Sequence, residues 1–236
     1  MSHFIGEFTG TALLVILGDG VVANVLLDKT KGNNSGLIVI AFGWAIAVFT
    51  GVYASTAIGG SGHLNPAVTL ALAAINKFDP GLIATYLAAQ FTGAIAGAII
   101  VWLSYKSHFD ATKDGDAKLG VFCTGPAIRN PVNNMITEIV GTFVLVLGAL
   151  LMSKPEHSLG TLDALPVGLL VLGIGVSLGG PTGYAINPAR DLGPRIAHFF
   201  LPIPNKRNSD WGYSWIPVVG PVIGGLLAAF IFKLFY

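Results

Sequence analysis

Charged residues and cysteine are both scarce in this sequence. Only 11% of its 236 residues are charged, against about 25% in soluble proteins, while 53% are hydrophobic. Cysteine occurs once, at Cys123, which excludes an internal disulfide and a zinc site built on cysteine pairs. A net charge of +1 without a basic block removes the electrostatic footprint of nucleic-acid binding, so no nucleic-acid partner is expected. The mean hydropathy of +0.71 indicates an integral membrane protein instead.

Long apolar runs are the main feature that is present. Crossing a bilayer core of about 30 Å takes about 20 helical residues. A run of about 11 residues reaches only about half of that distance, and its non-helical flanks cannot face lipid, so we expect it to fold back inside the protein. The six long runs lie at about 5–27, 37–58, 81–104, 133–153, 163–180 and 214–235, and the two short runs at about 66–76 and 188–200.

The chain also repeats itself. Each half contains three spans and one short run, and because three is odd, the second half enters the membrane from the opposite side. The matched segments are Glu7 to Thr11 with Glu138 to Thr142, Asn65-Pro66-Ala67 with Asn187-Pro188-Ala189, and Gly93/Gly97 with Gly220/Gly224. We therefore predict an all-α membrane protein with six transmembrane helices and two re-entrant half-helices. It forms one domain over 1–236, with inverted repeats at about 1–110 and 130–236.

Each Asn-Pro pair is predicted to begin a half-helix. Proline is favoured at the first helical position and asparagine directly before it. When the side-chain oxygen of Asn65 or Asn187 caps the helix, its amide NH₂ is left free as a donor. Two helix N-termini would also bring about half a positive charge each. This arrangement repels cations and protons and passes uncharged molecules that accept hydrogen bonds.

The segments GHLNPAVT and GYAINPARDLGPR resemble the aquaporins and aquaglyceroporins, the major intrinsic proteins, and look most like bacterial glycerol facilitators. The resemblance covers nearly the whole length. It implies a passive channel for glycerol and other small uncharged solutes, with some water, that excludes ions and protons and needs no cofactor or metal. No nucleophile and base pair suggests an enzyme.

The resemblance also implies a selectivity filter. Arg190 lies one helical turn beyond Asn187 and would donate to solute oxygens, because a buried arginine in a membrane calls for a function. Tyr184 matches an aromatic position of glycerol channels. Gly175 matches a histidine of water-selective members, and glycine there would make the filter wider.

A second aromatic wall is expected from Trp44. Its separation from Asn65 is one residue longer than the family pattern, so Phe42 is the competing choice. Two aromatic faces opposite an arginine would form an amphipathic slot that fits glycerol.

Four further residues receive roles from the same resemblance. Glu7 and Glu138 are the remaining carboxylates expected within the membrane. They either relay protons or, as the resemblance implies, accept N–H groups from the re-entrant loops. Asp191 is expected to tether a loop and to form a weak surface ion pair with Arg195. His63, before the first half-helix, either lines the lumen or stabilises its loop.

Several alternatives remain open. The solute could be undissociated lactic acid, dihydroxyacetone, urea or hydrogen peroxide, or the channel could select water. A proton-coupled secondary transporter would also use broken helices.

The family resemblance implies a homotetramer in the cell (plasma) membrane with cytoplasmic termini. The positive-inside rule favours the other orientation. Lys77, Lys154 and Lys233 fall on the termini side, against Lys29, Lys31, Lys106, Lys113, Lys118, Arg129, Lys206 and Arg207 opposite. We adopt the family orientation.

Overall fold

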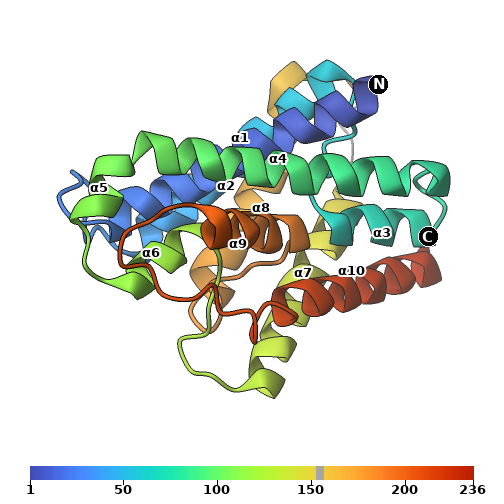
Figure 1. Cartoon of the computed structure of the whole chain (residues 1–236). Helices are drawn as coiled ribbons and strands as arrows, with labels where there is room; N and C mark the ends of the chain where they lie inside the picture. Colours follow the sequence, from blue (N-terminus) through green and yellow to red (C-terminus); the bar gives the residue numbers. More distant parts are fainter. Residues whose placement is uncertain (153–156) are drawn as a thin grey trace.

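The computed structural model describes residues 1–152 and 157–236, and the regular elements of this part are all helices (Figure 1). Within it, six helices are long and apolar enough to cross a membrane, which confirms the six predicted spans. They are α1 (Ser2–Leu26), α2 (Leu37–Ile58), α4 (Ile83–Ser104), α7 (Pro131–Leu151), α8 (Leu165–Leu178) and α10 (Ile216–Phe235), with short 3₁₀ turns η1 (Pro80–Leu82) and η2 (Gly160–Ala164) before α4 and α8. Residue 153, the last of the fourth predicted span, and Lys154, used in the charge count, lie outside the described residues.

Two helices of half length begin at the Asn-Pro pairs. Helix α3 (Pro66–Ala74) has 9 residues and α9 (Pro188–Phe200) has 13. The Oδ1 atom of Asn65 accepts the N–H of Ala67 at 2.9 Å, and that of Asn187 accepts the N–H of Ala189 at 3.0 Å. The predicted asparagine cap followed by proline at the first helical position is therefore present at both helices.

The two halves of the chain interlock. Helix α1 packs on α2 and α4, and α7 packs on α10, whereas α3 packs on α10 and α9 packs on α4, so each half-helix contacts the other half of the chain. A Cβ atom at Gly93 would lie 2.4 Å from the carbonyl oxygen of Phe8, and one at Gly224 would lie 2.2 Å from that of Ile139. No larger residue fits, so these glycines allow the close helix contacts expected in a membrane.

Both termini lie at one end of the molecule, and two short helices lie at the other (Figure 1). Helices α5 (Lys106–Ala111) and α6 (Gly115–Phe122) lie between the third and fourth predicted spans, where no helix was predicted. Phe109 and Phe122 are fully buried in a core cluster that includes Ala197 of α9. Helix α6 therefore covers α9 at the end away from the termini.

Candidate functional site

The N-terminal ends of α3 and α9 meet beside one cavity of about 690 Å³, whose wall includes Asn65 and Asn187. The Nδ2 atom of Asn65 donates to the carbonyl of Ile186 at 2.8 Å, and Nδ2 of Asn187 donates to that of Leu64 at 2.8 Å. The expectation of a wholly free amide is therefore wrong, because one of the two N–H bonds of each amide fixes the opposite loop. The other remains for a ligand. The lining also includes Lys77, Asp163, Trp44, Tyr184 and Arg190.

Glu138 holds the loop that leads into α9. Its Oε1 accepts from Thr182 Oγ1 at 2.7 Å and from the N–H of Ala185 at 3.0 Å, and its Oε2 accepts from the N–H of Ile186 at 2.8 Å. Ile186 has a φ of 44°, which a β-branched residue rarely adopts. The buried carboxylate thus stabilises a strained turn directly before the second Asn-Pro pair.

Glu7 does the same for the loop that leads into α3. Its Oε1 accepts the N–H of His63 at 3.0 Å, and its Oε2 accepts the N–H of Leu64 at 2.8 Å and Nε2 of Gln90 at 2.9 Å. Leu64, like its counterpart in the second half, has a positive φ, here 53°. The carboxylate oxygens of Glu7 and Glu138 are therefore occupied by the re-entrant loops, which favours their structural role over a proton relay.

His63 contributes to both the cavity wall and its loop. Its Nδ1 lies 3.1 Å from Oγ1 of Thr69, and its ring meets the edge of Phe78 with centroids 4.7 Å apart. The side chain is also part of the cavity lining. The two alternatives raised by the sequence therefore coexist in this geometry.

An aromatic–arginine cluster, made of Trp44, Tyr184 and Arg190, lies on the cavity wall. The Cζ atom of Arg190 lies 4.0 Å from the centroid of the Trp44 ring, a cation–π contact. Phe42, the competing aromatic, is 58% exposed on the outer surface, whereas Trp44 is 4% exposed. The geometry thus favours Trp44 as the wall residue.

Gly175 lies behind this cluster. A Cβ atom there would lie 2.9 Å from Cζ of Tyr184 and 3.1 Å from Cβ of Ala41. The Tyr184 ring therefore occupies the space that a side chain at Gly175 would take. That glycine here makes the filter wider stays a prediction.

Comparisons with known proteins place this geometry in a family. The sequence profile of the major intrinsic proteins matches residues 1–232. The chain belongs to the major intrinsic protein family. Its fold has a counterpart in the crystal structure of the aquaglyceroporin from Plasmodium falciparum, with a TM-score of 0.86, 31% identity, and coverage of 98% of this chain and 95% of that one.

Curated relatives of this major intrinsic protein are named for glycerol uptake. The probable glycerol uptake facilitator protein of Thermotoga maritima is 56% identical over 99% of both chains. A more distant relative, the D/L-lactic acid transporter of Lactiplantibacillus plantarum, is 39% identical over 99% of this chain and 98% of its own length.

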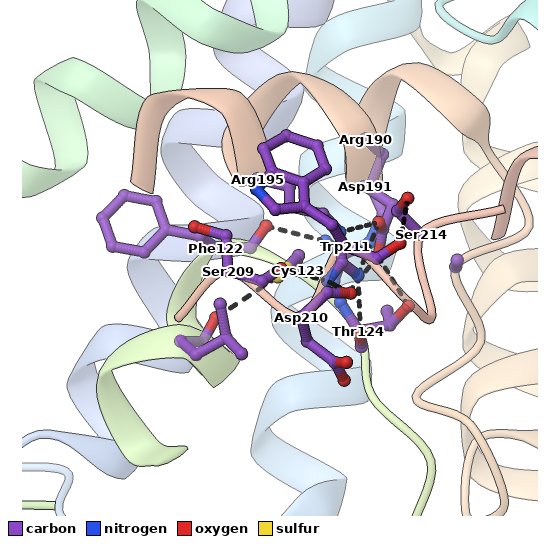
Figure 2. Close-up of polar contacts among 12 residues, drawn as sticks. Phe122, Cys123, Thr124, Arg190, Asp191, Arg195, Ser209, Asp210, Trp211 and Ser214 are labelled. Carbon is purple, nitrogen blue, oxygen red and sulfur yellow. Dashed lines mark hydrogen bonds and ion pairs between the residues drawn. The ribbon is translucent and has the colours of Figure 1, made fainter. Parts of the chain in front are cut away.

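Asp191 and Arg195, both in α9 of this family member, form a buried network of polar contacts with the neighbouring loops (Figure 2). Both side chains are 0% exposed, and Arg195 Nη2 lies 2.8 Å from Asp191 Oδ1. Asp191 Oδ2 accepts both the N–H and Oγ1 of Thr124 at 2.7 Å, and Arg195 donates to the carbonyl of Ser209 at 2.8 Å. The predicted weak surface ion pair is therefore wrong: the pair ties α9 to two loops inside the protein.

A further intramembrane carboxylate, Asp19 in α1, was not predicted as a site residue. It is 0% exposed, and its Oδ1 lies 3.7 Å from Nη1 of Arg190. The available signal was a second acidic residue, after Glu7, within the 25 residues of this apolar helix, since such residues in a membrane are functional by default.

Proposed function

We propose that this major intrinsic protein is a passive channel for glycerol and other small uncharged solutes, with some water, that excludes ions and protons. The observation that carries the proposal is the aromatic–arginine cluster on the wall of a cavity that also contains both capping asparagines. Relatives with 52–56% identity named for glycerol uptake support the same solute. The family consists of channels, so we propose neither an enzymatic activity nor a cofactor.

The chemistry of the wall matches a polyol. The faces of Trp44 and Tyr184 would contact the carbon backbone, while the guanidinium of Arg190 donates to the hydroxyl oxygens. Further along, the remaining N–H bonds of Asn65 and Asn187 would take over the same oxygens. The half-helix N-termini, with about half a positive charge each, would repel cations and protons.

Undissociated lactic acid is the runner-up solute. It is small and neutral, carries a hydroxyl, and fits the same division between apolar and donor walls. The relative named as a D/L-lactic acid transporter supports this alternative. A proton-coupled transporter is less favoured, because Glu7 and Glu138 both accept hydrogen bonds from the re-entrant loops.

Stopped-flow light scattering on proteoliposomes tests the proposed solute with a panel of water, glycerol, urea and lactic acid. Wild-type protein should raise glycerol permeability about tenfold or more over empty liposomes, because the channel adds a polar path that lipid alone does not offer. Tyr184→His should lower glycerol permeability more than water permeability, since an imidazole offers less apolar surface. Tyr236→His, at a residue 83% exposed, is the matched control.

Two results would reject the proposal. One is wild-type glycerol permeability equal to that of empty liposomes. The other is a lactic acid permeability well above that for glycerol, which would select the runner-up. If Tyr184→His lost no more glycerol permeability than Tyr236→His, the assignment of Tyr184 to the filter would fail.

We also propose a homotetramer in the plasma membrane with cytoplasmic termini, and one channel domain with inverted repeats at about 1–110 and 130–236. The matched hydrogen bonds of Glu7 and Glu138 support the repeats. Basic side chains on the face opposite the termini are partly neutralised, which weakens the conflict with the positive-inside rule. The pairs are Lys106 with Asp110, Arg129 with Asp210, and Arg207 with Asp116.

A further inference from the structure

Asp19 lies where an apolar residue would be expected. It falls midway between Val15 and Ala23 at helical spacing, and these two residues belong to a core cluster that includes Ala189 of α9. The side chain is 0% exposed. Within residues 1–152 and 157–236, neither carboxylate oxygen of Asp19 has a hydrogen-bond partner. A buried carboxylate without such partners is costly unless a charge compensates it.

The only cationic group paired with Asp19 in the described chain is Arg190, with 3.7 Å between Oδ1 and Nη1. Arg190 needs this carboxylate because the neighbouring Asp191 is already committed to Arg195 and Thr124. These four buried side chains therefore form two neutral pairs, Asp191 with Arg195 and Asp19 with Arg190.

The other contacts of Arg190 leave donors for a solute. Its Nη1, the atom that lies 3.7 Å from Asp19 Oδ1, is 3.5 Å from the carbonyl oxygen of Phe122, and its Cζ lies 4.0 Å from the centroid of the Trp44 ring. Among the described residues, Nε and Nη2 of Arg190 have no hydrogen bond to protein. Asp19 thus holds the guanidinium from behind without occupying the donors that a hydroxyl would use.

We propose that Asp19 is the counter-ion of Arg190 and makes the aromatic–arginine cluster electrically neutral, so that the channel rejects small anions as well as cations. This inference rests on the proposed channel function. An unpaired guanidinium beside two positive helix ends would repel cations but attract anions. A carboxylate 3.7 Å away turns that charge into a dipole, whose field falls off faster with distance.

Asp19 is therefore a positioning residue for selectivity. If it has this role, replacing it should make the channel leak ions, whereas loss of a merely structural residue would not. Proteoliposomes carry wild-type protein, Asp19→Asn or the control Asp28→Asn, the same change at an exposed residue nine positions later in sequence. Glycerol permeability is measured beside nitrate flux under a potassium diffusion potential. We expect Asp19→Asn to raise nitrate flux about tenfold, while Asp28→Asn leaves nitrate flux and glycerol permeability at wild-type values.

A second comparison holds the size of the filter constant. Arg190→Ala leaves Asp19 as an unpaired negative charge, so it should leak potassium more than nitrate. The double variant Asp19→Asn/Arg190→Ala also lacks the guanidinium but has no negative charge at position 19. Its potassium leak should be several-fold smaller than that of Arg190→Ala. If the Asp19→Asn protein cannot be reconstituted into liposomes, the Arg190→Ala variant tests the proposal by itself. Equal leaks of potassium and nitrate in that variant would overturn the proposal.

The outcomes separate the two proposals. Wild-type protein that carries no glycerol refutes the channel function itself. Wild-type protein that carries glycerol, with nitrate flux unchanged by Asp19→Asn, refutes only the counter-ion role. A loss of glycerol permeability in Asp19→Asn without an ion leak also overturns it, since Asp19 would then be purely structural.

Discussion

Replacement of Asp191 by asparagine should destabilise the protein by about 3–5 kcal/mol, the usual cost of removing one partner of a buried ion pair. The guanidinium of Arg195 would stay at 0% exposure without its carboxylate. Because Arg195 also bonds the carbonyls of Ser209 and Thr124, its displacement would release the two loops that cover α9. Thermal unfolding of the purified protein in detergent, followed by fluorescence size-exclusion chromatography, measures the loss.

The chain offers a matched control in Lys106 and Asp110. This pair has the same (i, i+4) spacing, but its side chains are 41% and 43% exposed. Asp110→Asn should therefore cost less than about 1 kcal/mol. Equal unfolding temperatures for the Asp191 and Asp110 variants would contradict the buried network as a source of stability.

Replacement of Gly175 by valine should have the second large effect, on glycerol permeability. The new Cβ would lie 2.9 Å from Cζ of Tyr184, which is too close, so the ring must move toward the cavity. To pass, glycerol must push the displaced ring back against the new side chain, which costs about 1–3 kcal/mol, as overpacking does, and each 1.4 kcal/mol added to the barrier lowers permeability about tenfold. We expect glycerol permeability to fall by about tenfold or more and water permeability to fall less, because water passes a narrower gap.

Gly173→Val is the control for this prediction. Gly173 lies on the same helix and is exposed, and a Cβ atom at that position would have nothing within 4 Å. Both variants carry the same loss of helix flexibility, so only the contact with Tyr184 differs. Equal glycerol permeability of the two variants would show that the Tyr184 ring does not limit passage.

The spans and half-helices could be predicted from sequence because their signals are local. The length of an apolar run sets whether it crosses a bilayer, and an Asn-Pro pair marks a helix start wherever the helix lies. Helices α5 and α6 gave no such signal, since they are 6 and 8 residues long and interrupted by charges. Their burial against α9 depends on tertiary packing.

The site was predicted less completely, because its remaining features join residues far apart in sequence. The amides of Asn65 and Asn187 bond the opposite loops across 121 and 123 residues. The burial of Asp191 depends on Thr124. Asp19 was visible as a charge in an apolar run, but its partner Arg190 lies in the other half of the chain.

The central claim, that solute passes between the two half-helices, is tested most directly by blocking the cavity. Val68 in α3 lines the cavity, whereas Ile136 in α7 is 53% exposed on the outer surface. A neutral methanethiosulfonate reagent should abolish glycerol permeability in Val68→Cys and leave Ile136→Cys and wild type, whose Cys123 is buried, unaffected. Undiminished glycerol permeability in fully modified Val68→Cys would contradict the account.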